Sequence, residues 1–319
     1  MITISVPAHD VADAVRDLGS DVEVVVWDPS QSDAPEDTRD RIQLACVAHK
    51  TGGRTVYGRL GECSALKVIQ IPSAGYEHAA PFVPAGVALA NARGVHDTRT
   101  AEMALLLTLA SQRQLFEFMA SQQVKEWEPY YFAPSLADKR VLIVGYGSIG
   151  SAIGARMRVC EALVEGVART ARTAPDGTTV HAMDDLLELV PHADVIVVVL
   201  PLDENTARVV DAAFLARMQD GALLVNVGRG GTVDTDALVD ALNSGRRLRA
   251  ALDVTDPEPL PADHPLWHAP GVIITPHVAG FEVLTNRRYT DLLRRQVDAL
   301  RSGGEPVNVV HVGVAGRSR

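Results

Sequence analysis

The chain has 319 residues, and 30 Lys and Arg against 40 Asp and Glu give it a formal net charge of −10 at pH 7. A surface this acidic disfavours nucleic acids and anionic membranes as partners, while 47% hydrophobic and 22% charged residues indicate a folded protein with room for about two domains. Three scattered cysteines without a CxxC pair, no signal-peptide pattern and only short apolar runs predict a cytoplasmic protein without a metal site or a disulfide framework.

Short apolar runs separated by polar segments organise the N-terminal part of the chain. We expect a helix at 10–18 and buried strands at 2–6, 23–27, 43–48, 67–71 and 87–91. A long helical segment follows from Thr98 to about Lys125 and is apolar on most of its faces. Such a helix must be buried between layers or between subunits.

A second series, beginning at Arg140, alternates between strand and helix patterns. Its unbroken apolar runs predict strands at 141–145, 164–168, 195–200, 222–227, 250–254 and 272–276. Helices are expected between them, for example at 184–190, 211–218 and 234–245. This alternation is typical of an α/β fold with a doubly wound parallel sheet. A last helix at about 283–302 and a strand at 307–310 come after the complete series, and we expect them to return to the first domain.

The stretch GYGSIG (145–150) follows a predicted strand and opens a predicted helix. Gly145 permits a tight turn, Gly147 lets a pyrophosphate approach the backbone, and Gly150 allows close packing of helix on strand. Ser148 and Ile149 begin the helix, whose N-terminus offers N–H donors to phosphates. Glycine-rich turns also occur for purely geometric reasons, but in this strand–helix–strand context the motif predicts a dinucleotide site.

The segment GVARTAR (166–172) indicates which dinucleotide is bound. NAD-selective proteins of this type carry an Asp or Glu at the end of the second strand, where it binds the ribose hydroxyls. Here Ala168 takes that place, and Arg169, Thr170 and Arg172 follow. Guanidinium groups match phosphate geometry, so we expect NADP to be preferred, with NAD possible. The alternative is that these arginines are surface charges in a loop.

Three later residues have the chemistry that carboxylate and carbonyl substrates need. Arg229 follows a predicted strand and can hold a carboxylate bidentately or polarise a ketone oxygen. His277 also follows a strand and can donate a proton, and Glu258, if hydrogen-bonded to it, would keep the imidazole protonated. Each could instead be an ordinary loop residue. The three together at the carboxyl edge of one sheet favour a catalytic role.

Five ordered motifs carry a family resemblance: GYGSIG, LPLDENT (200–206), NVGRGGTVDTDAL (226–238), ALDVTDPEPL (251–260) and TPHVAG (275–280). With SAGYEH (73–78) and TAEMALLLTLASQR (100–113), they resemble the D-isomer-specific 2-hydroxyacid dehydrogenases over nearly the whole chain. The resemblance implies a Rossmann domain (95–282) inserted into a discontinuous flavodoxin-like substrate domain (1–94 and 283–319). It also implies an Arg–Glu–His catalytic set, which falls on Arg229, Glu258 and His277.

The same resemblance assigns further contacts. The backbone at Ala74 and Gly75 should receive the carboxylate of a small 2-keto acid, together with Arg229 and His277. Thr100, Pro201, Asp253 and Gly280 should contact the cofactor, beside the glycine loop and the arginine segment. The helix from Thr98 resembles the segment through which family members form homodimers.

The sequence leaves the substrate and the class of function open. Glyoxylate and hydroxypyruvate are plausible small substrates, but nothing in the residues selects them, and the loop 48–55 has no clear counterpart in the family pattern. A nucleotide-sensing regulator without physiological catalysis could keep the same residues. An enzyme acting on another oxyanion, such as phosphite or formate, is a further alternative, although SAGYEH lacks the lysine that phosphite-type relatives use.

Overall fold

The computed structural model describes residues 1–49, 52–127, 133–280 and 283–314. The chain forms two compact units, Met1–His96 with Glu282–Arg319, and Asp97–Phe281. The predicted domain limits at 94/95 and 282/283 lie within two residues of these boundaries. Lys50 and Thr51 of the 48–55 loop are outside the described residues.

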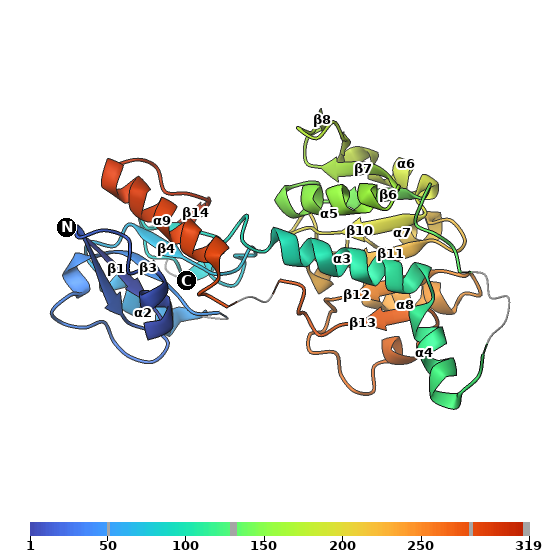
Figure 1. The fold of residues 1–319 in the computed structure, drawn as a ribbon, viewed down its shortest axis with the longest axis horizontal. Coiled ribbons are helices and arrows are strands. Elements are labelled where there is room, and N and C mark those ends of the chain that lie inside the picture. Colours follow the sequence, from blue (N-terminus) through green and yellow to red (C-terminus); the bar gives the residue numbers. More distant parts are fainter. Residues whose placement is uncertain (50–51, 128–132, 281–282, 315–319) are drawn as a thin grey trace. The chain divides into compact units, whose positions relative to one another are not determined.

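The Met1–His96 and Glu282–Arg319 unit contains a six-stranded sheet of order β14-β5-β4-β3-β1-β2 (Figure 1). Read from β2, the parallel strands run 2-1-3-4-5, which is the flavodoxin-like order, and β14 pairs antiparallel with β5. All five strands expected in the N-terminal part are therefore present. The strands are β1 (Ile2–Val6), β2 (Val22–Val26), β3 (Ile42–Cys46), β4 (Val68–Gln70), β5 (Ala88–Ala90) and β14 (Val309–Val312). The helices are α1 (His9–Ala14), α2 (Arg54–Gly61) and α9 (Arg287–Ser302).

Helix α9 follows the sequence prediction but begins later than the expected residue 283. The side chain of Asn286 accepts hydrogen bonds from the amides of Arg288 and Tyr289, and this N-cap sets the first turn. Its apolar face, with Tyr289 and Leu293, packs in one core cluster with residues of β1, β3 and β4. The C-terminal segment thus completes the N-terminal sheet.

The Asp97–Phe281 unit contains an eight-stranded sheet of order β13-β12-β11-β10-β6-β7-β9-β8. Counted from β6, the parallel strands run 7-6-5-4-1-2-3, which contains the Rossmann order 3-2-1-4-5-6. The strands are β6 (Arg140–Val144), β7 (Leu163–Ala168), β8 (Arg172–Thr173), β9 (Thr179–Ala182), β10 (Val195–Val198), β11 (Leu223–Asn226), β12 (Arg249–Leu252) and β13 (Val272–Ile274). The helices are α3 (Asp97–Gln112), α4 (Leu115–Val124), α5 (Ser148–Val159), α6 (Leu186–Leu189), α7 (Ala212–Arg217) and α8 (Thr235–Asn243).

Alternate residues of these strands point to opposite faces, and each face has its own helices. Helices α3 and α5 lie side by side on one face (Figure 1), where Leu107 and Ile153 pack against Ile143. Helices α6, α7 and α8 cover the other face, where Phe214 and Leu242 belong to a second core cluster. The sheet is therefore doubly wound, as the unbroken apolar strand patterns predict.

The expectation of one helical segment over 98–125 is wrong in one respect. Gln114 adopts a left-handed conformation with φ 53° and separates α3 from α4. Arg249 reinforces the end of α3, because its guanidinium donates to the carbonyl oxygen of Ser111 at 2.9 Å. Helix α3 buries one side, whereas α4 leaves Phe116 and Met119 about half exposed. None of the helices in the described residues is long and apolar enough to cross a membrane.

Candidate active site

The loops after β6, β10, β11, β12 and β13 all leave the same edge of the sheet, because these strands are parallel neighbours. Two glycines allow the loops to approach each other closely. A Cβ atom at Gly145 would lie 2.7 Å from the carbonyl oxygen of Val199, and one at Gly230 would lie 1.9 Å from that of Thr255. No other residue fits at either place, so the glycines of the two motifs bring the loops together.

The three glycines of GYGSIG serve different purposes in the structure. Gly145 has φ 108°, which a side chain would strain. A Cβ atom at Gly150 would lie 2.4 Å from the carbonyl oxygen of Gly145, so only glycine lets α5 start this close to the loop. A Cβ atom at Gly147, in contrast, would meet nothing within 4 Å. The open side of the loop is therefore at Gly147, where the sequence places the pyrophosphate.

The start of α5 has donors to offer to a phosphate group. The amides of Ser148, Ile149 and Gly150 donate to no acceptor among the described residues. Free amides at a helix N-terminus bind anions well, since the helix dipole adds positive potential there. The loop thus fits a dinucleotide by its open backbone and by its unpaired donors. Sequence reasoning missed one contact here: the Ser148 hydroxyl donates to the carboxylate of Asp97.

The end of β7 carries exposed cations and no acid. Ala168 is its last residue, and Arg169 and Thr170 follow in an exposed loop. The Arg169 side chain makes no hydrogen bond or ion pair within the described part of the chain. Arg172 is engaged differently, because its guanidinium donates to the carbonyl oxygens of Tyr146 (2.6 Å) and Thr170 (3.2 Å). The two arginines therefore occupy different environments.

His277 and Glu258 lie together, as their sequence interpretation requires. Nδ1 of His277 is 2.6 Å from Oε1 of Glu258. The two side chains are 41% and 42% exposed, so both are accessible to a ligand. A carboxylate can only accept a hydrogen bond, so Nδ1 carries the proton in this pair and Nε2 is left for another partner. A pair of this kind can orient an imidazole ring for proton transfer.

Asp253 holds the loop that carries His277. It is 1% exposed, and its Oδ1 accepts from the Thr275 hydroxyl (2.6 Å) and the Val278 amide (3.1 Å). Its Oδ2 accepts from the Ala279 amide (2.9 Å), and its carbonyl oxygen accepts from the His277 amide (2.7 Å). These bonds support the left-handed backbone of His277, with φ 53°. The sequence assigned Asp253 to the cofactor, and nothing in the motif revealed this internal role.

Arg229 sits directly after β11 in a loop fixed by its own backbone. The carbonyl oxygen of Arg229 accepts from the Asn226 amide group (3.0 Å) and the Thr232 hydroxyl (2.7 Å). Its guanidinium donates to the carbonyl oxygen of Gly228 at 2.8 Å. The side chain is partly buried. Arg229, Glu258 and His277 thus project from three loops at one edge of the same sheet.

The remaining predicted contacts are distributed over both units. Thr100 is buried on α3, Pro201 is exposed after β10, and Gly280 is partly buried beyond His277. Ala74 and Gly75 follow β4 in the other unit. The Asn91 side chain donates to the carbonyl oxygen of Ala74 at 2.6 Å, while the amides of Ala74 and Gly75 donate to no described residue. That loop therefore has donors available for an anion.

The two buried thiols, Cys46 and Cys63, offer no reactive group of their own. Burial raises the pKa of Cys46 to about 12 and that of Cys63 to about 11, so both stay protonated at neutral pH. In the described ranges no three His, Cys, Asp or Glu side chains gather to hold a metal ion.

Comparisons with known proteins point to one family. Residues 105–279 match the family model of the D-isomer specific 2-hydroxyacid dehydrogenase, NAD binding domain. A glyoxylate reductase of Thermofilum pendens is 30% identical over 294 residues, which are 89% of this chain and 86% of that protein. A D-isomer specific 2-hydroxyacid dehydrogenase of Xanthobacter autotrophicus, solved with NADPH and MES, matches 97% of both chains with a TM-score of 0.81 and 25% identity. An NADPH-dependent glyoxylate/hydroxypyruvate reductase of Sinorhizobium meliloti, solved with NADP and sulfate, matches 97% of both chains with a TM-score of 0.78 and 26% identity.

Proposed function

Since the chain belongs to the D-isomer-specific 2-hydroxyacid dehydrogenase family, we propose that it reduces a small 2-keto acid to the D-2-hydroxy acid with NADPH as cofactor. The observation that carries this proposal is the 2.6 Å pair between His277 and Glu258 at the carboxyl edge of a Rossmann sheet. The bound cofactor supplies the hydride. The residues of this chain supply orientation, charge and the proton.

His277 is the proposed proton donor. Glu258 accepts from Nδ1 and so orients the ring, and a proton carried on Nε2 would be donated to the substrate oxygen as negative charge develops there. The left-handed backbone at His277 is maintained by the buried Asp253. Because the pair and its support are already formed, little reorganisation is needed when a substrate binds.

Arg229 is the proposed carboxylate clamp and oxyanion partner. A guanidinium can bind a carboxylate through two parallel N–H donors and still direct charge towards the adjacent ketone oxygen. The amides of Ala74 and Gly75 are the proposed additional donors to the substrate carboxylate, supported by their lack of acceptors in the described residues. Glyoxylate and hydroxypyruvate are the first substrates to try, because related reductases act on them.

The glycine loop and the arginine segment are the proposed cofactor site. Gly147 and the amides of Ser148 and Ile149 would hold the pyrophosphate, with Gly145 and Gly150 shaping the turn. Arg169 is the proposed main ligand of the 2′-phosphate, since its side chain is exposed and has no partner in the described chain. Thr170 and Arg172 are auxiliary. Thr100, Pro201 and Asp253 remain proposed contacts on the nicotinamide side, and Gly280 remains a proposed cofactor contact.

We further propose that two copies associate through α3 and α4. Together these helices expose several large apolar side chains, and grouped apolar side chains on a surface are typical of interaction sites. The group comprises Leu106, Leu115, Phe116, Met119 and Val124. A homodimer would cover it.

The experiment that tests the proposed activity is a screen of 2-keto acids with NADPH and NADH, followed by the nicotinamide absorbance. We expect turnover of at least one small 2-keto acid and a higher kcat/KM with NADPH. His277→Ala should lower kcat by about 10²–10⁴, while His268→Ala, at an exposed histidine outside the site, should not. Tight NADPH binding without turnover of any substrate would instead favour a nucleotide-sensing regulator.

A further inference from the structure

We propose that Tyr146, the second residue of GYGSIG, positions the loop that recognises the 2′-phosphate, so that cofactor selectivity depends on its hydroxyl group. This inference rests on the proposed preference for NADPH. Tyr146 is 1% exposed and cannot itself contact a cofactor with its side chain. It is therefore a positioning residue, which acts through the segment between β7 and β9.

Two glycines outside the nucleotide motif make room for the Tyr146 ring. A Cβ atom at Gly166 in β7 would lie 2.4 Å from Cδ2 of Tyr146. A Cβ atom at Gly154 in α5 would lie 2.7 Å from its hydroxyl oxygen. The ring is thus enclosed between a strand and a helix in a slot that excludes larger residues. This enclosure fixes the position of the Tyr146 hydroxyl group.

The backbone of Tyr146 ties the glycine loop to the segment after it. Its amide donates to the carbonyl oxygen of Val167 at 2.8 Å, and its own carbonyl oxygen accepts from Arg172 at 2.6 Å. The side chain contacts the same segment further along. Its hydroxyl donates to Asp176 at 2.8 Å and lies 2.9 Å from the hydroxyl of Thr178. Tyr146 therefore holds both the start and the turn of the β8–β9 hairpin.

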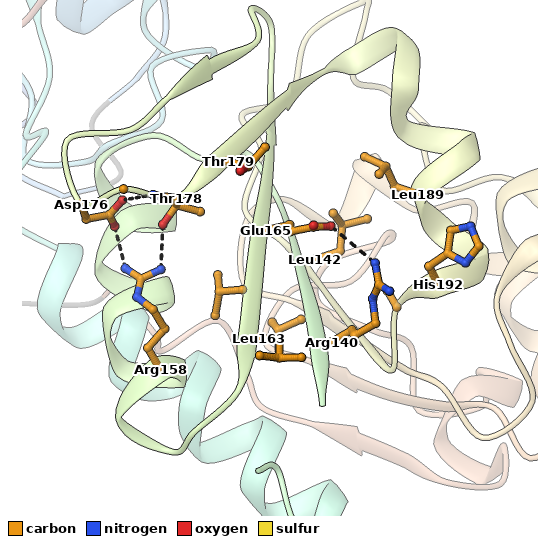
Figure 2. A pocket seen from close by; sticks show the side chains of 14 residues that line it. Arg140, Leu142, Arg158, Leu163, Glu165, Asp176, Thr178, Thr179, Leu189 and His192 are labelled. Carbon is orange, nitrogen blue, oxygen red and sulfur yellow. Dashed lines mark hydrogen bonds and ion pairs between the residues drawn. The ribbon is translucent and has the colours of Figure 1, made fainter. Parts of the chain in front are cut away.

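Arg158, at the end of α5, completes this polar cluster. Its guanidinium faces both partners of the tyrosine (Figure 2), with bonds of 2.6 Å to Asp176 and 2.7 Å to Thr178. Burial disfavours the charged carboxylate, but the hydrogen bonds from Thr178, Tyr146 and Arg158 outweigh it and hold the pKa of Asp176 well below its usual range. The cluster is thus ionised and connected at neutral pH.

Strand β9 of the hairpin is held by its parallel pairing with β7 and by Val180, which is buried in the core, whereas β8 is attached to the sheet through β9. Strand β8 is two residues long and lies at the edge of the sheet, and so short a hairpin is not stable by itself. A cavity of about 480 Å³ lies beside the turn, so packed side chains do not support it there (Figure 2). The cavity is lined by Asp176 and Thr178 on one side and by Arg140, Glu165 and His192 on the other. The polar cluster around Tyr146 therefore adds to the pairing of β7 with β9 and fixes the turn that carries β8.

The hairpin in turn sets the position of the cations. Arg169 and Thr170 lie between the end of β7, which its pairing with β6 holds in the sheet, and the start of β8, so one end of their loop depends on the hairpin. Removing the Tyr146 hydroxyl would let this loop fluctuate. Binding of a 2′-phosphate would then have to order it, whereas contacts with the rest of the cofactor would be unaffected.

The test compares two ligands on the full chain by calorimetry: adenosine 2′,5′-bisphosphate, which carries the extra phosphate, and adenosine 5′-monophosphate. We expect Tyr146→Phe to bind the bisphosphate about fivefold more weakly, as for the loss of a hydrogen-bonded anchor, and to bind the monophosphate as before. The KM for NADPH should rise by a similar factor while the KM for NADH stays constant. Tyr57→Phe is the matched control, because Tyr57 is equally buried in the other unit and its hydroxyl has no hydrogen-bond partner among the residues that the structure describes.

The outcomes separate this inference from the proposed function. If the unmodified protein does not prefer the bisphosphate, the proposed NADPH selectivity is wrong and the inference with it. If Arg169→Ala loses the preference but Tyr146→Phe keeps it, only the role of Tyr146 is wrong. Equal weakening of both ligands would show a general structural role and would also overturn the inference. Should Tyr146→Phe fold poorly, Asp176→Asn tests the same cluster with the same expected selectivity loss.

Discussion

Replacing Asp253 with Asn should damage both the stability of the Asp97–Phe281 unit and catalysis. The carboxylate accepts three hydrogen bonds, two at Oδ1 and one at Oδ2. An asparagine has one oxygen and one donor group. With its oxygen in the Oδ1 position it keeps the bonds from Thr275 and Val278, which makes this orientation the better one. The amide of Ala279 then faces an NH₂ group instead of an acceptor.

The magnitude follows from this single mismatch. Ala279 is 4% exposed, so its amide cannot recover the lost bond from water. Losing a bond to a charged acceptor and leaving a buried donor unpaired costs about 2–3 kcal/mol. For a unit of this size that is a fall of roughly 5–10 °C in Tm. The left-handed backbone of His277 would lose support next to it, and we expect kcat to drop by about tenfold.

Thermal unfolding followed by circular dichroism and steady-state kinetics of the same preparations provide the measurement. Thr275→Val is the matched control, since it removes one donor to Asp253 but leaves no buried amide without an acceptor. It should cost only about 1 kcal/mol and should affect kcat less. If Asp253→Asn were no more harmful than Thr275→Val in both measurements, Asp253 would not be the support of the His277 loop.

Four shorter predictions concern the other features. Glu258→Gln keeps a hydrogen-bond acceptor near His277 but removes the negative charge. In steady-state assays kcat should fall about ten- to a hundredfold while the KM for NADPH stays unchanged. An unaltered kcat would contradict the proposed acid–base pair. Arg229→Lys should restore little of the activity lost in Arg229→Ala, because an ammonium cannot form the bidentate contact. If Arg229→Ala raised the substrate KM but left kcat unchanged, Arg229 would not stabilise the oxyanion. The pKa of Asp176 in the folded protein is lowered from 3.8, so the ionised side chain stabilises the fold at neutral pH. This stabilisation is lost as the pH falls from about 5 towards 2. In denaturant titrations, the difference in free energy of unfolding between the unmodified protein and Asp176→Asn should therefore become smaller over that range. Met119→Glu places a charge in the proposed interface and should therefore shift the protein to a monomer in light scattering. A dimer that persists in this variant would show that α4 is not the interface.

The sheets and the proximity of Glu258 to His277 could be predicted because their signals are local. Buried parallel strands need unbroken apolar runs, and the spacing of Gly145 and Gly150 reflects a contact within the loop itself, since a Cβ atom at Gly150 would meet the carbonyl oxygen of Gly145. Glu258 and His277 each follow a neighbouring strand, so their proximity follows from the order of the sheet. At these positions the residues that are close in the sequence already determine the structure, so the local pattern is sufficient to predict it.

Other features depend on partners far away in the sequence. The β8–β9 hairpin is short and polar, and it is held by Tyr146 and Arg158 rather than by its own strands. The sequence predicts Arg172 as an auxiliary phosphate ligand, and it does not reveal that the guanidinium also donates to the carbonyl oxygen of Tyr146 in the glycine loop. The break at Gln114 occurs where Arg249 meets the end of α3. The spacing of apolar residues within one segment cannot predict polar contacts between residues that are far apart in the sequence.

The interrupted course of the first unit has a consequence for how the protein is made. Strand β14 pairs with β5, joining Val309 to Ala90, and α9 packs on the same sheet. The N-terminal strands therefore leave the ribosome long before the segment that completes their sheet, with an edge of β5 unpaired in the meantime. The inserted Asp97–Phe281 unit is continuous and can fold as soon as it is synthesised. Order of synthesis and order of folding thus differ: the part of the chain made first is the part finished last.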